Sequence, residues 1–197
     1  MKEEAVRNGW PLRLSAGLIG SCTNSSFEDL SRAASVIDNA LQRNLKVKSK
    51  FIVIPGSEKV RMISEEAGLM DVFRRAGARL FANACGPCIG QWDRGEDKGR
   101  NSIVHSFNRN FARRADGNPD THAFVASPEI VAALSVAGSL MFNPMTDMVL
   151  SPERKLIRLP EPEGGTLPPV VQDGPPPGYR TPPADRKSIK VSISAGS

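Results

Sequence analysis

The chain has 197 residues, of which 40% are hydrophobic and 24% are charged, which is typical of a globular domain with its own core. No apolar run approaches the roughly 18 residues of a membrane span, and the first residues lack the apolar core of a signal peptide. Glu3 and Glu4 also argue against a transit peptide, so we expect no membrane and no targeting segment in this chain.

The formal net charge is +5 and the sequence pI is about 9.4, a balance that fits anionic small molecules or nucleic acid. Lys46, Lys48 and Lys50 form the pattern of a solvated stripe. Only one Tyr and two Trp are present, so a platform for stacking bases is poorly supplied. We therefore do not expect nucleic acid as a partner.

Short apolar runs alternate with amphipathic stretches over the first three quarters of the chain, which predicts an α/β fold with a mostly parallel sheet flanked by helices. Apolar residues between positions 30 and 41 recur at helical spacing, and Ser25 with Glu28 has the spacing of a capping box. The predicted strands are residues 17–20, 51–54, 79–82, 102–106 and 123–126.

Two further helical regions follow from the positions of glycine and proline. Residues 58–76 predict one or two helices interrupted near Gly68, with Gly77 as the stop. Ser127 begins a last helix, with proline in its first turn, that runs to about Gly138.

The composition changes at about residue 151, since ten of the sixteen prolines lie between positions 152 and 183. A packed sheet does not accommodate such a run, so the sequence predicts an extended Pro-rich tail. We assign residues 1–150 to one α/β domain and residues 151–197 to a Pro-rich linker or tail. Residues 188–194 alternate like a short strand.

The three cysteines are Cys22, Cys85 and Cys88, of which the last two have Cys-x-x-Cys spacing. Such a pair alone fits a redox site, half of a zinc site or a structural pair. The two histidines lack ligand spacing for zinc, and an odd number of cysteines disfavours a disulfide framework. Three thiolates also suit three corners of a four-iron cluster, whose fourth corner then stays free for chemistry.

The chemically interesting residues all follow predicted strands. Cys22 follows the first strand, Cys85 the third, Asn108 and Arg109 the fourth, and Ser127 the fifth. In an open parallel sheet, ligands bind beyond the carboxyl ends of the strands. We therefore expect these loops to meet at one edge of the sheet.

Several segments together resemble the aconitase family, in particular the third domain of the mitochondrial type. They are GSCTNSSFEDL (20–30), PGS (55–57), NACGPCIGQWDR (83–94), SFNRNF (106–111) and the stretch 118–144. Homoaconitase and isopropylmalate dehydratase share the cysteine pattern and the NRNF element, but the block at 83–94 favours aconitase. The resemblance is dense from residue 16 to 147 and weaker through the tail.

The resemblance implies a [4Fe–4S] cluster held by Cys22, Cys85 and Cys88, with one iron left open. It further implies interconversion of citrate and isocitrate through cis-aconitate, in which the open iron acts as a Lewis acid. The implied partners are these tricarboxylates and the remaining domains of the enzyme. The implied compartment is the mitochondrial matrix, or the cytoplasm if the source is bacterial.

The same resemblance assigns roles to the NRNF element and its neighbourhood. Arg109 and Arg114 would contact substrate carboxylates, which suit the planar guanidinium group. Asn108 would form a hydrogen bond beside the cluster. The catalytic base is implied to come from a domain absent from this chain, so we expect no catalytic residue here and no turnover by the chain alone.

The sequence departs from the family pattern at three positions. Arg113 stands where glycine is usual before Arg114, and a positive φ there would strain the loop. Phe107 replaces the common tyrosine, and His105 replaces threonine as a strand residue. We expect His122 to satisfy a local hydrogen bond near the fifth strand.

Two other classes of function compete with the hydro-lyase interpretation. An iron-sensing, RNA-binding module would use the basic charge, and RNA binding would then depend steeply on salt. A plain redox or metal-binding Cys-x-x-Cys protein would show zinc or a two-electron thiol titration without iron.

Overall fold

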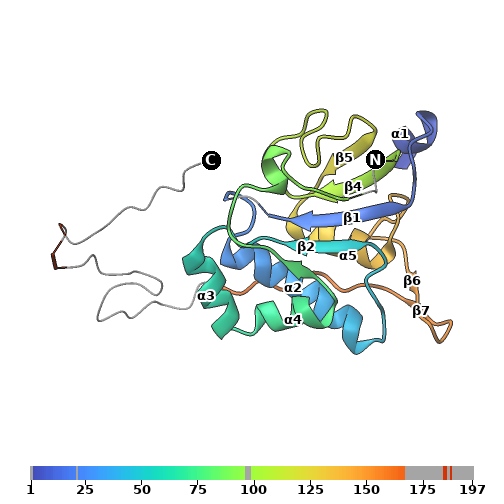
Figure 1. The fold of residues 1–197 in the computed structure, drawn as a ribbon. Coiled ribbons are helices and arrows are strands. Elements are labelled where there is room, and N and C mark those ends of the chain that lie inside the picture. The colour runs from blue at the N-terminus through green and yellow to red at the C-terminus, as the bar shows by residue number, and fades with distance from the viewer. Residues whose placement is uncertain (1, 21, 96–98, 167–183, 186, 188–197) are drawn as a thin grey trace.

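The computed structural model describes residues 2–20, 22–95, 99–166, 184–185 and 187. Within these residues a five-stranded parallel sheet has the strand order β3-β2-β1-β4-β5 (Figure 1). The strands are β1 (Leu14–Ile19), β2 (Lys50–Val53), β3 (Arg79–Leu80), β4 (Asn101–His105) and β5 (Thr121–Val125). All five predicted strands and the predicted α/β class are confirmed.

The chain winds outward from β1 in two directions. The first half proceeds through β2 to the edge strand β3, and the second half returns to pair β4 with the free side of β1. The strand order therefore reverses between β1 and β4. In open parallel sheets a crevice forms at such a reversal, beyond the carboxyl ends of the strands.

The helix α2 (Phe27–Gln42) follows β1 and begins one residue later than the sequence suggested. Its N-cap is Ser26, whose hydroxyl accepts from the Asp29 amide while the Asp29 carboxylate accepts from the Ser26 amide. The predicted capping box of Ser25 and Glu28 is wrong by one position, because the Ser25 side chain is fully buried instead.

The other predicted helices are confirmed, together with their boundaries at glycine. The region 58–76 forms α3 (Glu58–Glu66) and α4 (Leu69–Arg75), separated at Gly68, which has a φ of +74°. The helix α5 (Pro128–Ala137) ends at a left-handed Gly138. A short helix α1 (Lys2–Arg7), which the sequence analysis did not anticipate, precedes the sheet.

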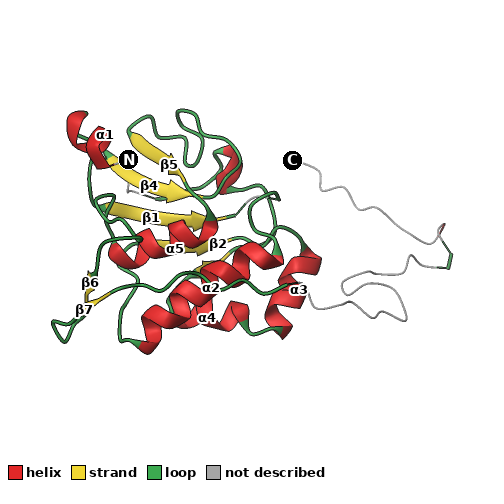
Figure 2. Cartoon of the chain, turned by 180° about the vertical axis from the view of Figure 1, so that it is seen from behind, coloured by secondary structure: helices red, strands yellow, loops and turns green. Residues whose placement is uncertain are grey.

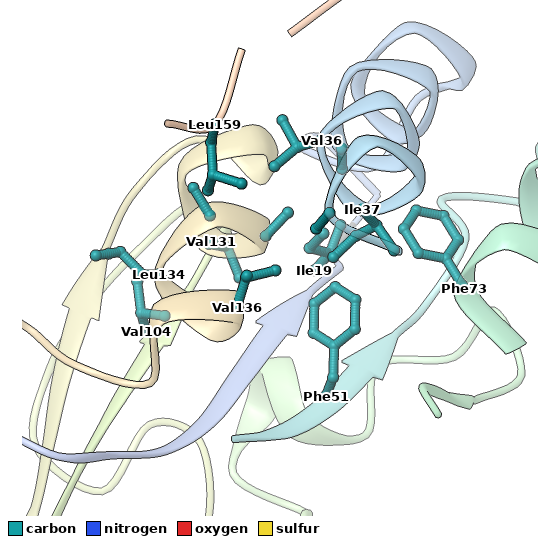
Figure 3. Packing of buried hydrophobic residues seen from close by; sticks show 14 of the residues in the cluster. Ile19, Val36, Ile37, Phe51, Phe73, Val104, Val131, Leu134, Val136 and Leu159 are labelled. Atoms are coloured by element: carbon teal, nitrogen blue, oxygen red, sulfur yellow. The ribbon is translucent and has the colours of Figure 1, made fainter. Parts of the chain in front are cut away.

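Helices cover one face of the sheet, which we call the helical face. Seen from behind, α5 lies in front of the central strands, α2 packs beside α5, and α4 lies next to α2 (Figure 2). Alternate residues of the strands point into this layer, including Ile19, Phe51 and Val104, and the side chains of α2 and α5 converge on them (Figure 3). Phe73 of α4 packs edge-on against Phe51, with ring centroids 6.1 Å apart. This face holds the larger apolar core.

The opposite face, which we call the loop face, is covered by two connecting segments. They are the cysteine loop (residues 81–95) and the arginine loop (residues 106–118), which follow β3 and β4. The intervening strand residues, such as Leu18 and Ile103, pack there against Trp92 and Phe107. The loop face has the smaller apolar cluster, so its order depends more on polar contacts.

The segment after residue 148 begins with the hairpin β6 (Val149–Leu150) and β7 (Leu156–Ile157). Residues 158–166 are extended and lie against α2, where the amides of Glu163 and Gly165 donate to the hydroxyls of Ser35 and Ser31. Leu159 joins the core of the helical face. Residues 167–183 and the strand predicted at 188–194 lie outside the described residues, and the domain boundary at 150 stays a prediction. No helix in the described part of the chain is long and apolar enough to cross a membrane.

Candidate functional site

The sequence-predicted site residues lie at the carboxyl edge of the sheet. Cys22 follows β1, Cys85 follows β3, and Asn108 and Arg109 follow β4. Ser127, after β5, is the N-cap of α5. Because the strands are all parallel, these loops leave the sheet at the same edge, which confirms the expected arrangement of the loops. Cys22 is not at a helix terminus, since α2 begins only at Phe27.

Ser106 joins the loops that follow the two central strands. Its amide donates to the Leu18 carbonyl (3.0 Å), and its hydroxyl accepts from the Gly20 amide (3.0 Å). The Asn24 side-chain amide donates to the Ser106 carbonyl (2.6 Å). The turn that carries Cys22 is therefore tied on both sides to the start of the arginine loop.

The cysteine loop turns sharply at its Cys-x-x-Cys element. Pro87–Ile89 forms a single 3₁₀ turn, which ends at Gly90 with a φ of +85°. A Cβ at Gly90 would approach the Arg114 carbonyl oxygen to 3.3 Å, in a conformation that favours glycine. Glycine at this position therefore lets the cysteine loop pack directly on the arginine loop.

The three thiols differ in exposure and influence one another. Cys22 and Cys85 are exposed, whereas Cys88 is 7% exposed, and none of them forms a disulfide. Burial raises the pKa of the Cys88 thiol, and the Cys85 and Cys22 thiols raise it further, while the Arg114 guanidinium acts in the opposite direction. Cys85, Cys22 and Arg114 thus each lie within electrostatic reach of Cys88.

In the part of the chain that the structure describes, no three His, Cys, Asp or Glu side chains converge closely enough to hold a single metal ion. A four-iron cluster makes a different demand, because each cysteine binds its own iron and the sulfurs surround a cluster instead of a point. Three soft thiol donors on neighbouring loops fit that demand in donor type. They fit it better than zinc, which usually takes four ligands around one centre.

The cationic residues of the site lie on the arginine loop. The Arg114 guanidinium donates to the Asn108 side-chain oxygen (3.3 Å) and lies 5.0 Å from the centre of the Phe111 ring. Arg109 and Asn108 are exposed, as is Phe111. Of the three arginines on this loop, Arg114 is oriented by its neighbours and lies within electrostatic reach of the Cys88 thiol.

Arg113 has a left-handed backbone, with a φ of +66°. This is the conformation that the usual glycine accommodates without cost and that a side chain disfavours. The condition named in the sequence analysis, a positive φ at this position, is thus met. Arg114 nevertheless keeps its hydrogen bond to Asn108.

The two histidines are structural in their contacts. His105 is fully buried, its Nδ1 accepts from the Phe107 amide (3.1 Å), and its ring stacks on Phe107. Burial lowers the pKa of His105 to about 4, and the Arg114 guanidinium also lowers it, while Asn110 acts in the opposite direction. His122 accepts from the Arg100 guanidinium (3.2 Å) beside β5, as expected.

One buried pair was not anticipated from the sequence. Arg94 and Asp116 form an ion pair of 3.0 Å, with only 3% and 2% of their side chains exposed. The pair joins the cysteine loop to the arginine loop. Arg94 belongs to the block at 83–94, but nothing in its sequence spacing indicates Asp116 as the partner.

Comparison with known proteins identifies relatives of the chain. The aconitase family (aconitate hydratase) matches residues 1–138. Mitochondrial aconitate hydratases of Saccharomyces cerevisiae, Candida albicans and Gracilaria gracilis are 51%, 53% and 52% identical to it. The alignments cover 98%, 98% and 100% of this chain and 25% of each relative. The chain therefore spans about a quarter of the length of the curated relatives it matches.

Proposed function

The chain belongs to the aconitase family, and we propose that it supplies the cluster-binding and substrate-binding part of an aconitate hydratase. The observation that carries this proposal is the grouping of Cys22, Cys85 and Cys88 with Arg114 on neighbouring loops of a chain about half identical to such enzymes. The relatives are named mitochondrial, and we propose the mitochondrial matrix as the compartment.

In this proposal Cys22, Cys85 and Cys88 hold a [4Fe–4S] cluster. When bound, such a cluster with one iron free of protein ligands supplies Lewis acidity toward a hydroxyl group of the substrate. Cys88 and its apolar neighbour Trp92 are both buried, which keeps water away from one side of the loop. The thiols of Cys22 and Cys85 are exposed and therefore accessible from solvent.

The arginine loop binds and orients the substrate in this proposal. Arg109 and Arg114 bind carboxylates of citrate or isocitrate, because a guanidinium group stays charged at physiological pH and matches the carboxylate geometry. The Asn108 side-chain oxygen accepts a hydrogen bond from the Arg114 guanidinium group and so restricts its orientation. The same guanidinium group lies over the face of the Phe111 ring, which stabilises its charge.

Removal of a proton from carbon needs a base, and neither His105 nor Asp116 is available for that role. His105 is buried and bonded to the backbone, and Asp116 is buried in an ion pair. We propose that the base belongs to another part of a longer enzyme or assembly, and that the chain alone binds but does not turn over substrate.

The test is anaerobic reconstitution of the 197-residue chain with ferrous iron and sulfide, followed by analysis of both per chain. We expect four irons and four sulfides, or about three irons after oxidation of the open corner. Cys22→Ser, Cys85→Ser and Cys88→Ser should each abolish stable loading. Ser127→Ala, which alters the N-cap of α5 at the same edge, should not.

Two results would contradict the proposal. Loading unaffected by Cys22→Ser would remove Cys22 from the ligand set and leave a Cys-x-x-Cys site. Tight binding of one zinc with no uptake of iron would favour a plain metal site.

A further inference from the structure

The buried ion pair between Arg94 and Asp116 connects the two loops that carry the proposed site. Its Nη1–Oδ2 distance is 3.0 Å, and both side chains are almost completely buried. Arg94 lies six residues beyond Cys88 along the chain, and Asp116 lies just beyond Arg114. The pair thus joins the C-terminal ends of the two loops, next to the first residues of β4 and β5.

Side chains of the sheet form hydrogen bonds with this pair. Arg94 donates to the side-chain oxygens of Asn101 (2.6 Å) on β4 and Ser15 (3.0 Å) on β1. Asp116 accepts from the Thr121 hydroxyl (2.8 Å) on β5. The two charges are therefore fixed to three adjacent strands as well as to each other.

Contacts lead from the pair toward the thiols. The Arg94 guanidinium lies 4.8 Å from the centre of the Trp92 ring, and the Trp92 amide donates to the Ala115 carbonyl (3.3 Å). Trp92 shares an apolar cluster with Cys88, and each is 7% exposed. Trp92 therefore connects Arg94 to the apolar cluster that contains Cys88.

A buried ion pair is weak support for stability, because the loss of hydration offsets much of the attraction between the charges. Such a pair does define the relative orientation of its two side chains, because a planar guanidinium group with several fixed acceptors has one favourable geometry. The loop face has few apolar residues to set the position of its loops.

We propose that Arg94 and Asp116 act as positioning residues, a clamp that sets the Cys85–Cys88 segment relative to the arginine loop. Neither residue touches substrate or cluster in this proposal. The inference deepens the proposed function, on which its biological meaning rests, but the clamp itself is testable in the cluster-free chain.

The experiment measures alkylation of each cysteine in the reduced, cluster-free chain by iodoacetamide, with rates read by mass spectrometry of the separate peptides. In Arg94→Met we expect the rate at Cys88 to rise about tenfold or more. The cysteine loop can then open locally without the energetic cost of breaking the ion pair. Cys22 is on a different loop and serves as the internal reference, with an unchanged rate.

Arg94→Lys keeps the charge but lacks the guanidinium fork, and should show an intermediate rate at Cys88. Asp116→Asn should also raise this rate, which keeps the test available if Arg94→Met does not fold. The matched control is Phe73→Leu, which weakens the core of the helical face without touching the loops. It should leave the rate at Cys88 unchanged at denaturant concentrations where the chain stays folded.

The proposal is overturned if the rate at Cys88 stays at the wild-type value in Arg94→Met and Asp116→Asn. It is equally overturned if that rate follows global stability, so that Phe73→Leu raises it as much as the clamp variants do. Failure of the wild-type chain to take up iron would contradict the cluster proposal, while the alkylation rates would still decide the clamp.

Discussion

The helical face and the loop face of the same sheet are held by different kinds of interaction. On the helical face, the packing of α2, α4 and α5 on alternate strand residues is almost entirely apolar. On the loop face, a small apolar cluster is supplemented by the Arg94–Asp116 pair and its hydrogen bonds. Apolar burial contributes most to folding, whereas directional polar bonds define one arrangement of two irregular loops.

The residues of the helical face therefore contribute mainly to folding, whereas those of the loop face mainly set the positions of the proposed site residues. The helical face tolerates a change in detail if its volume is kept. If the proposed function is correct, the loop face has less tolerance, because its cysteines and arginines follow different strands and must keep fixed relative positions. The following predictions test this contrast, starting with the largest effect.

Phe73→Ala should lower the free energy of unfolding by about 4 kcal/mol, because it leaves a cavity beside Phe51 in the helical core. The control is the same substitution at Phe111, which is 60% exposed on the arginine loop. Phe111→Ala should cost less than about 1 kcal/mol, mainly through its contact with Arg114. Urea unfolding measures both, and equal losses would contradict the contrast between the faces.

Asp116→Asn should lower the free energy of unfolding by about 3 kcal/mol, because it leaves the Arg94 charge buried without its counter-charge. The matched control is Glu129→Gln, which breaks the more exposed pair of Arg32 and Glu129 on the helical side. That change should cost less than about 1 kcal/mol. A loss of similar size in both variants would show that burial does not increase the contribution of the Arg94–Asp116 pair to stability.

Acidification should reduce stability through His105, whose pKa is about 4 when folded and near its ordinary value of 6.5 when unfolded. The unfolded chain therefore binds a proton that the folded chain does not, and stability falls as pH drops from 6.5 towards 4. We expect a loss of about 2 kcal/mol between about pH 7 and pH 4.5.

His105→Asn retains an acceptor for the Phe107 amide and removes the titrating ring. Its stability curve should be flatter than that of the wild type over the same pH range. Parallel curves for the two proteins would show that His105 does not titrate in this way.

Arg113→Gly should stabilise the chain by about 0.5 kcal/mol, because glycine adopts the φ of +66° without strain but has more freedom when unfolded. Arg154→Gly provides a control of the same residue type and conformation (φ +61°) in the β6–β7 turn. Both should raise the melting temperature slightly, and a loss of stability in Arg113→Gly would indicate favourable contacts of the Arg113 side chain.

Regular elements were predictable because they follow local patterns. Short apolar runs between amphipathic stretches identified all five strands, and glycines at 68, 77 and 138 marked the ends of helices. The predicted N-cap of α2 was wrong by one residue, because Ser25 and Ser26 each have an acidic residue three positions later. Only the burial of Ser25 distinguishes them. The short α1 and the two-residue strands β6 and β7 have too little periodicity to be recognised.

The candidate site was predictable in its residue types and its edge of the sheet, since Cys22, Cys85 and Asn108 each follow a strand. The clamp was not, because Arg94 and Asp116 meet through irregular loops of no fixed period. Arg113 could be recognised as a departure, but its left-handed backbone required the structure.

The central claim is a cluster with one open corner held by Cys22, Cys85 and Cys88 beside Arg109 and Arg114. The most direct test is Mössbauer spectroscopy of the chain reconstituted with ⁵⁷Fe, recorded with and without citrate. We predict one iron whose signal differs from the other three and shifts when citrate is added, and loss of that shift in Arg114→Gln. Four equivalent irons that are indifferent to citrate, or no cluster at all, would contradict the claim.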